Sequence, residues 1–359
     1  MAQIELKGIV KKFGAHTALR DLNLTIEDGE FFVLLGQTGA GKTTTLRLIA
    51  GLEKPSEGQI FIDGTDVGSW GAAERDVALV LQQYSLYPRF TVRENLEFPL
   101  KSKIRRLPAA EIAQRVERAA GTLQIGHLLD RKTDRLSGGE MQRVSIGRAI
   151  VRNPRVFLMD EPLSALDAKL REALRTELKN LQMELDATFL FVTHDQIEAM
   201  SMGDKIGVLN GGSLVQVGTP AEIYNHPLNT FVARYVGSPP MNLFDGKLAD
   251  GRAIIAPSTF ELACNSAQSG RTDGRELTFG VRPEDLFLES GAPVEARVYD
   301  VENHGVAKIV TLRVDGLTMQ LTAPARMQVK IDETVRFGWD PEKILLFDRK
   351  SGVNLHHAA

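Results

Sequence analysis

The sequence predicts an α/β domain that contains a helical insertion, followed by a smaller all-β domain. Two observations carry this prediction. Apolar runs of the kind that form buried strands stand at residues 31–35, 77–81, 156–159 and 188–192, and segments of other character separate them. After about residue 237 the segments become short and β-rich, punctuated by glycine and proline, which is typical of a small β-barrel.

Composition limits the classes of protein that fit. The chain has 359 residues, with 43% hydrophobic and 25% charged residues, which is ordinary for a globular protein of more than one average domain. A net charge of −3 argues against a general nucleic-acid binder. The single cysteine, Cys264, excludes an intramolecular disulfide framework and a cysteine-rich zinc site, and it indicates a reducing compartment such as the cytosol.

The signals of a secreted or membrane-spanning chain are also missing from the sequence. The first residues contain no apolar region of the kind found in secretory signals. No apolar stretch is long enough to span a bilayer. We therefore expect a soluble protein, or one that other chains hold at a membrane.

The first segments of the chain read as strands. Residues 22–26 alternate apolar and polar side chains, as a half-buried strand does. Upstream, Phe13 precedes Gly14, and an aromatic ring at the rim of a strand can offer its face to a nucleobase. Because most aromatic side chains are buried, the sequence alone favours a core position for Phe13.

Residues 36–43 read GQTGAGKT and fit the phosphate-loop pattern G-x-x-x-x-G-K-[ST]. The context fits as well, because a buried-strand run precedes the loop and residues 44–50 can form a helix after it. Glycines let the backbone approach an anion closely, and the loop N–H groups and the helix N-terminus attract phosphates. We expect Lys42 to reach the terminal phosphates and Thr43 to give its hydroxyl to Mg²⁺.

Three further strand-like runs end in polar residues. Gln82 follows the run at 77–81, Asp160 and Glu161 follow the run at 156–159, and His194 follows the run at 188–192. Ligands of α/β sheets bind beyond the strand ends, so these residues and the phosphate loop form one constellation. Two adjacent buried acids are costly without a cation. This cost favours Asp160 as a Mg²⁺ residue and Glu161 as the residue that orients and deprotonates water.

Residues 84–135 read as a mostly helical insertion broken by prolines. Residues 111–120 are amphipathic, with Ile112, Val116 and Ala119 on one face. The insertion also carries several aromatic and apolar residues, which form either its own core or a docking surface, and the sequence leaves these alternatives open. These residues are Tyr84, Leu86, Tyr87, Phe90 and Phe98.

A second anion-binding helix start is predicted at residues 137–140. Ser137 and Glu140 have the spacing of a capping box, so a helix should begin there. Gly138 and Gly139 lie at the start of that helix, where free N–H groups can also bind an anion. Downstream we expect a leucine-rich helix over about residues 170–185, a hairpin at 206–217 and another at 309–321.

These motifs together resemble those of ABC-transporter ATPases, in the same order along the chain. The segments that carry the resemblance are GQTGAGKTT, LQQYSLYP, LSGGEMQRV, VFLMDEP, SALD and VTHDQIEAM. LSGGE is the most discriminating, because other phosphate-loop NTPases lack it. GSPPMN and VRPEDL are similar to segments of ATP-binding subunits of bacterial carbohydrate importers, including the maltose and glycerol-3-phosphate types.

The resemblance implies a domain organisation. A RecA-like phosphate-loop ATPase core, the ABC nucleotide-binding domain, would occupy residues 1–236, with a helical subdomain at about 84–153. A regulatory β-barrel-like domain of the OB, TOBE and MOP kind would occupy residues 237–359.

The resemblance also implies roles for residues that would hold ATP within one chain. Phe13 stands where an aromatic residue stacks on adenine. The phosphates would lie against a run of loop residues, which are Gly36, Gln37, Thr38, Gly39, Ala40, Gly41, Lys42, Thr43 and Thr44. Departures from the family pattern are small: Gln37-Thr38 stands where Pro-Ser is common, and Phe13 where Tyr is common.

Further roles are implied for catalysis and for the seam between two copies. Gln82 would lie near Mg²⁺ and the permease contact, with Asp160 as a metal ligand. Glu161 would be the general base and His194 would contact the γ-phosphate and water. In the family, residues matching Ser137, Gly138 and Gly139 bind the nucleotide of the other subunit, and a residue matching Asp167 lies at the dimer seam.

As partners, the resemblance implies a second copy of the chain, two transmembrane permease subunits and an extracytoplasmic solute-binding protein, and no nucleic acid. A cytosolic regulator at the C-terminal domain is an additional expectation. The protein would lie on the cytoplasmic face of the inner membrane and couple ATP hydrolysis to import of a carbohydrate. Two alternatives stay open, an ABC ATPase that acts on ribosomes or DNA and a binding module that sequesters a regulator.

Overall fold

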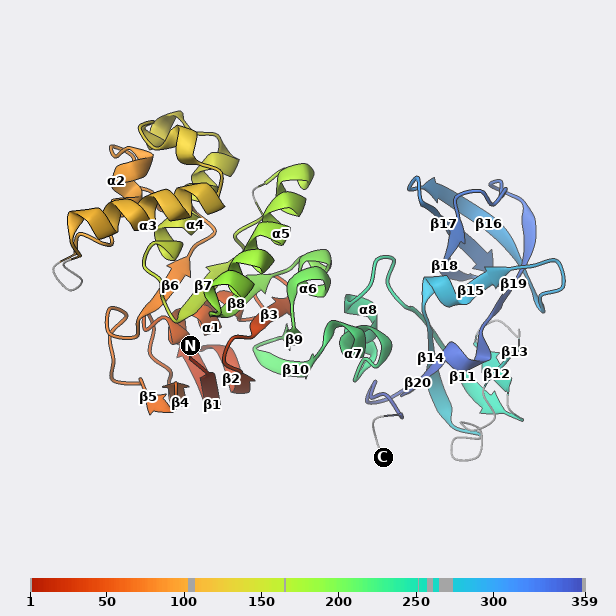
Figure 1. Cartoon of the computed structure of the whole chain (residues 1–359). Coiled ribbons are helices and arrows are strands. Elements are labelled where there is room, and N and C mark those ends of the chain that lie inside the picture. The colour runs from red at the N-terminus through yellow and green to blue at the C-terminus, as the bar shows by residue number, and fades with distance from the viewer. Residues whose placement is uncertain are drawn as a thin grey trace. The chain divides into compact units, whose positions relative to one another are not determined.

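The computed structural model describes residues 2–102, 107–164, 166–250, 252–256, 261–264 and 274–356. The chain divides into two compact units, Met1–Pro220 and Ala221–Ala359 (Figure 1). Within the described ranges, no helix is both long and apolar enough to cross a membrane.

A six-stranded sheet with the strand order β10-β9-β3-β8-β7-β6 organises the first unit. Its strands are β3 (Phe31–Gly36), β6 (Val77–Val80), β7 (Val156–Asp160), β8 (Thr188–Thr193), β9 (Lys205–Asn210) and β10 (Ser213–Gly218). Neighbouring strands run parallel except β9 and β10, which form the predicted hairpin. The predicted apolar runs are confirmed as strands, and β3, β7 and β8 are buried along their whole length, as parallel strands covered on both faces should be.

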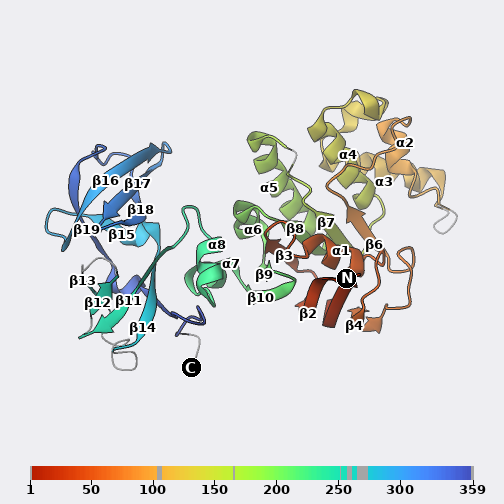
Figure 2. The same ribbon diagram turned by 180° about the vertical axis from the view of Figure 1, so that it is seen from behind.

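Helices cover both faces of this sheet (Figures 1 and 2). They are α1 (Lys42–Ile49), α5 (Ala168–Leu185) and α6 (Gln196–Met202). Leu46 and Ile49 of α1 share a hydrophobic core with Leu158 and Leu190 of the sheet. Leu174, Leu178 and Leu181 of α5 are buried, which confirms the predicted leucine-rich helix.

A four-stranded antiparallel sheet with the order β2-β1-β4-β5 packs into the same core as α1. Its strands are β1 (Ile4–Phe13), β2 (His16–Ile26), β4 (Glu57–Ile62) and β5 (Thr65–Asp66). Leu22, Leu24 and Ile26 are buried, so the predicted alternation is confirmed. The core position favoured for Phe13 is wrong: its side chain is 46% exposed, because β1 ends there at the rim of the sheet.

The insertion between β6 and β7 is helical, as predicted. It contains α2 (Val92–Glu97), α3 (Ala109–Thr122), two short 3₁₀ helices η1 (Gly126–Leu128) and η2 (Thr133–Arg135), and α4 (Gly138–Ile150). Ile112, Val116 and Ala119 face inward from α3. Tyr87, Phe90 and Phe98 form a ring cluster with centroid separations of 4.5 to 6.0 Å.

The second unit opens with two short helices, α7 (Pro220–Asn225) and α8 (Thr230–Tyr235), and continues as two five-stranded antiparallel sheets. One sheet has the order β13-β12-β11-β14-β20, and the other has the order β15-β19-β16-β17-β18. Buried side chains of both sheets form one core, which includes Phe279, Phe337 and Trp339. The predicted all-β fold and the predicted hairpin, β17 with β18, are confirmed.

The strands of the first of these sheets are β11 (Asn242–Ala249), β12 (Arg252–Ile255), β13 (Glu261–Ala263), β14 (Glu276–Val281) and β20 (Leu345–Asp348). Those of the second are β15 (Leu286–Leu288), β16 (Val294–Asn303), β17 (Ala307–Val314), β18 (Leu317–Pro324) and β19 (Thr334–Trp339). The 3₁₀ helices η3 (Pro283–Asp285) and η4 (Pro341–Lys343) connect strands in this unit.

The break between the compact units falls earlier than the predicted boundary between residues 236 and 237. The buried side chain of Arg282 shows why. Its guanidinium donates hydrogen bonds to the carbonyls of Tyr224, Ala233 and Val236, which lie in or next to α7 and α8. These bonds fasten both helices to the β-rich unit.

Candidate functional site

The phosphate loop joins β3 to α1 and is shaped by glycine. Gly41 caps α1 with φ 109°, a conformation that favours glycine. A Cβ atom on Gly41 would lie 2.7 Å from Leu19 Cδ2 and 2.9 Å from the carbonyl oxygen of Ala18. No side chain caps α1 and no acid stands in its first turn, so its N-terminal N–H groups remain available to an anion.

Lys42 is turned into the loop. Its side chain is 5% exposed, and Nζ donates to the carbonyl oxygens of Gly36 at 2.8 Å and Gln37 at 3.1 Å. Nζ also lies 3.4 Å from Glu161 Oε1. A buried cation therefore stands between the loop and the end of β7, where it can neutralise an anion bound against the loop.

The ends of β7 and β8 meet the start of α1. Thr43 Oγ1 donates to Asp160 Oδ1 at 3.1 Å, although the two residues lie far apart in sequence. Burial, and to a smaller degree the neighbouring Glu161, raise the pKa of Asp160, while the Thr43 hydroxyl opposes this shift. His194 Nδ1 lies 2.9 Å from Glu161 Oε2. The structure thus brings together the polar strand ends that the sequence singled out.

Gln82 reaches this group through a hydroxyl. Its Nε2 donates to Ser164 Oγ at 3.4 Å, and Ser164 Oγ donates to the carbonyl oxygen of Glu161 at 2.9 Å. Glu161 itself has φ 45°, which is uncommon for a residue other than glycine. Its backbone N–H bonds to the carbonyl of Val192 at 2.9 Å. This bond holds the turn that aims the carboxylate at Lys42 and His194.

A cavity of about 250 Å³ lies over the phosphate loop. Its walls combine the loop with the tip of the β1–β2 hairpin, and the lining residues are Phe13, His16, Ala18, Gly39, Gly41, Lys42, Thr43 and Thr44. The lining combines an aromatic ring with the residues of the phosphate loop. That arrangement suits a ligand with a flat ring and an anionic tail.

Ser137, Gly138 and Gly139 lie at the N-terminus of α4, apart from this cavity. The predicted capping box is present: Glu140 N donates to Ser137 Oγ at 3.3 Å, and Ser137 N donates to Glu140 Oε2 at 2.7 Å. The bond from Ser137 N lowers the pKa of Glu140. Among the described residues, no side-chain hydrogen bond or ion pair joins Ser137 to the phosphate loop.

Asp167 caps α5, where its carboxylate accepts a hydrogen bond from Leu170 N at 3.0 Å. Arg171, one turn further along, was not singled out by the sequence. Its guanidinium donates to the carbonyl of Leu166 at 3.0 Å and lies 3.4 Å from Asp195 Oδ2. Arg171 therefore ties the segment before Asp167 to the residue that follows His194.

Other residues near the site also escaped the sequence reasoning. His16 lines the cavity and Ser164 bridges Gln82 to Glu161. Glu198 is buried, accepts from Thr193 Oγ1, and has its pKa raised mainly by that burial. Glu198 could have been noticed as a glutamate in a short helix that follows a strand end. His16 could have been noticed because it lies opposite Phe13 in the hairpin.

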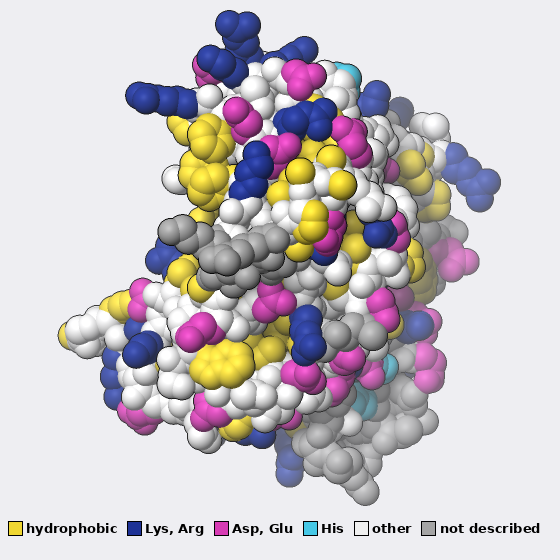
Figure 3. Space-filling view, turned by 60° about the vertical axis from the view of Figure 1, so that its left-hand side comes forward, with side chains coloured by type: hydrophobic (Ala, Val, Ile, Leu, Met, Phe, Trp, Pro, Cys, Tyr) yellow, Lys and Arg dark blue, Asp and Glu magenta, His cyan; other side chains and the backbone are white. Residues whose placement is uncertain are grey.

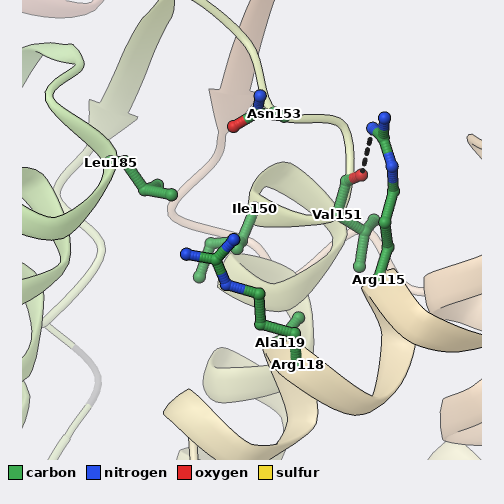
Figure 4. Close-up of a pocket in the computed structure, with 7 residues that line it drawn as sticks. All are labelled: Arg115, Arg118, Ala119, Ile150, Val151, Asn153 and Leu185. Carbon is green, nitrogen blue, oxygen red and sulfur yellow. Dashed lines mark hydrogen bonds between the residues drawn. The ribbon is translucent and has the colours of Figure 1, made fainter.

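A separate hollow of about 180 Å³ lies where α3 meets the ends of α4 and α5 (Figure 4). Arg115 and Arg118 stand at its rim, and Ala119, Ile150 and Leu185 supply apolar lining. Both arginines have carboxylate partners, Glu111 at 2.7 Å and Glu184 at 2.9 Å. None of the residues predicted to bind nucleotide lies in this hollow.

Comparison with known proteins identifies the family. The ABC transporter family model matches residues 19–164, the MalK OB fold domain matches 237–286 and the TOBE domain matches 279–347. The trehalose/maltose import ATP-binding protein MalK of Thermococcus litoralis is 48% identical over 98% of this chain and 99% of that protein. The chain belongs to the ABC transporter ATP-binding proteins. This result confirms the resemblance, the predicted fold class and the assignment as an ATPase.

Other relatives of this ABC ATPase cover nearly the whole chain as well. The sn-glycerol-3-phosphate import ATP-binding protein UgpC of Ruegeria pomeroyi is 45% identical over 99% of both chains. Among solved structures, the dimeric post-hydrolysis state of the ATP-binding cassette MJ0796 bound to ADP and Pi matches with 33% identity and a TM-score of 0.55. That match covers 60% of this chain and 98% of the other.

Proposed function

We propose that this ABC ATPase powers the import of a carbohydrate or sugar derivative through partner membrane permeases. The observation that carries the proposal is the likeness over nearly the whole chain, C-terminal domains included, to proteins named for trehalose/maltose and sn-glycerol-3-phosphate import. The site supports the ATPase half of the proposal, since the phosphate loop, Asp160, Glu161 and His194 converge.

Phe13 stacks on adenine in the proposed complex, and the phosphates lie along the loop. Lys42 then exchanges its contact with Glu161 for phosphate oxygens. This exchange frees the Glu161 carboxylate at the moment when ATP arrives. Because Lys42 is almost fully buried, its charge acts in a region where water screens it weakly.

The residues present fit Mg²⁺. Thr43 Oγ1 and a partly desolvated Asp160 carboxylate already lie in contact, and hard oxygen donors are the ligands that Mg²⁺ prefers. We assign Thr43, Asp160 and Gln82 to the metal, with phosphate oxygens supplying further positions. Bound there, Mg²⁺ would offset the negative charge that builds up on the phosphate oxygens.

Glu161 is the general base in this proposal. It takes a proton from water while the water oxygen bonds to the γ-phosphorus and the bond to the ADP oxygen breaks. His194 holds the carboxylate in place through Nδ1, which carries the proton because a carboxylate only accepts. The other ring nitrogen is left for the water or the γ-phosphate.

Two copies of the chain complete the site. One chain supplies the phosphate loop and Glu161, and the partner copy supplies Ser137, Gly138 and Gly139, with Asp167 at the seam. The separation of Ser137 from the loop within one chain supports this arrangement, as does the dimer described for MJ0796. ATP favours the closed dimer because it contacts both copies, and hydrolysis removes that preference.

The helical insertion is the proposed permease contact. Phe98 is 46% exposed within its ring cluster, and the guanidinium of Arg148 from α4 lies 4.8 Å from the Tyr87 ring centroid. On the face shown in Figure 3, hydrophobic side chains reach the surface in separate groups among charged ones. A permease contact through the helical insertion would place the protein at the cytoplasmic face of the membrane.

The test is isolation of the complex from membranes with this chain as bait. We expect two permease subunits to co-purify and ATP hydrolysis to rise when a solute-binding protein is added with its sugar. Recovery with ribosomes or DNA instead would refute the transport role. A cytosolic protein that binds the C-terminal domain would be an added regulator if permeases co-purify as well. A complex that carries Glu161→Gln should assemble without hydrolysing ATP.

A further inference from the structure

The β1–β2 hairpin places a histidine in the cavity that contains the phosphate loop. Phe13 and His16 are directly opposed partners in the antiparallel register. Opposed residues of a hairpin project from the same face, so the two rings stand side by side at its tip. Both line the cavity of about 250 Å³ together with Lys42 and Thr43.

Only one face of the Phe13 ring is available to a ligand. Lys11 Nζ lies 4.6 Å from the ring centroid and covers the other face. Lys11 is 9% exposed, and its ammonium donates to Glu53 Oε2 and to the carbonyl of Lys54, each at 2.9 Å. A fixed cation therefore sets the position of the ring, and a flat ligand can stack on the remaining face.

We infer that His16 is a nucleotide-binding residue that forms a hydrogen bond to the nucleoside half of ATP. The inference rests on the proposed function, in which the phosphates occupy the loop and the base stacks on Phe13. The ribose then lies between these two ends, beside the hairpin tip. A neutral imidazole has one donor and one acceptor, which matches a ribose hydroxyl or a polar edge of the base.

The experiment measures equilibrium binding to the full chain in the presence of a metal chelator, so that hydrolysis does not interfere. The probes are ATP, 2′-deoxy-ATP and inorganic triphosphate. His16→Ala should raise the Kd for ATP about three- to tenfold, the effect of one hydrogen bond, and change that for triphosphate less than about twofold. His16→Gln, which keeps a donor and an acceptor, should recover most of the affinity. His127→Ala, at an exposed histidine of η1, is the matched control.

The probes show whether the ribose 2′-hydroxyl is the partner of His16. If it is, His16→Ala weakens the binding of ATP but not of 2′-deoxy-ATP. If the 3′-hydroxyl or the base edge is the partner, His16→Ala weakens the binding of both nucleotides. Unchanged ATP affinity in His16→Ala, or an equal loss for triphosphate, would overturn the inference. If Phe13→Ala loses affinity for ATP while His16→Ala keeps it, the inference about His16 fails and the proposed function stands. Failure of the unaltered chain to bind ATP would defeat both.

Discussion

Two helices of this chain start with glycines and sequence features that suit an anion, yet their N-termini are built differently. Helix α1 begins at Gly41 with no side-chain cap and no acid in its first turn. Helix α4 begins at Ser137 with a complete capping box, and Glu140 stands in its first turn. The first N-terminus keeps its N–H groups for a ligand, whereas the second satisfies part of them within its own chain.

This contrast indicates which half of the site we expect to act alone. Lys42 is the first residue of α1 and can offset phosphate charge, so we expect this half to bind a nucleotide by itself. Helix α4 is stable without a ligand, and the Glu140 charge disfavours a free anion there. An anion should reach the N-terminus of α4 only when a second copy presents it already bound.

The largest effect is expected at the end of β7. Glu161→Gln removes the proton acceptor but keeps the shape, so turnover should fall about 10²- to 10⁴-fold while ATP binding survives. The measurement is ATP hydrolysis beside equilibrium ATP binding. Glu172→Gln, on the exposed side of α5, is the control. Hydrolysis near the normal rate would refute the role of Glu161.

Ser137→Arg tests the helix that needs a partner. The long cation at the N-terminus of α4 should reduce hydrolysis at least tenfold, because it blocks the approach of the second copy. ATP binding to the isolated monomer should change less than about twofold, since the phosphate loop is untouched. If monomer binding were lost together with hydrolysis, the two helices would serve one site within one chain.

Gly41→Ala tests the uncapped helix. Since φ is 109° and a Cβ would meet Leu19 and Ala18, the variant should lose about 1–3 kcal/mol of unfolding free energy and also bind ATP less tightly. Gly121→Ala, where a Cβ meets nothing within 4 Å, should change stability by less than about 1 kcal/mol. Denaturant unfolding of both variants gives the comparison, and equal effects would contradict the account of the loop.

The smallest effect is expected at the cap of α4. Ser137→Ala removes one acceptor for an N-terminal N–H and should lower the free energy of unfolding by about 1 kcal/mol.

The pKa of Glu140 is lowered by its bond from Ser137 N. The contribution of Glu140 to the free energy of unfolding is therefore present above the pKa that this group has in the unfolded chain, and it disappears as pH falls through the lowered value. The free energies of unfolding of Glu140→Gln and of the unaltered chain should therefore become equal as pH falls through the lowered pKa. A difference that persists at lower pH would argue against the cap.

Most of the fold could be predicted from the sequence because local patterns determine it. Buried strands such as β7 are continuous apolar runs, and the capping box that starts α4 is written in two residues. The convergence of Asp160, Glu161 and His194 followed from a general property of α/β sheets. The confirmed elements therefore depend on short-range signals or on a rule of topology.

What sequence reasoning missed depends on contacts between distant segments. The sequence raised a rim position for Phe13 but favoured the core, since composition cannot distinguish the end of a strand from its middle. Arg171 meets Asp195 across two elements, and Arg282 fastens α7 and α8 to the β-rich unit, which shifted the break between compact units. These contacts arise only once the chain is folded.

The most direct test of the shared site is a disulfide between two differently tagged chains, one with Thr38→Cys and the other with Ser137→Cys. Native Cys264 should stay unreactive, because burial raises its pKa to about 11. If the two chains share the site, a mixed disulfide-linked dimer should form with ATP and not without it. Two results would rule out a site shared between chains: a disulfide that forms within a single chain carrying both substitutions, or a mixture that forms no disulfide with ATP.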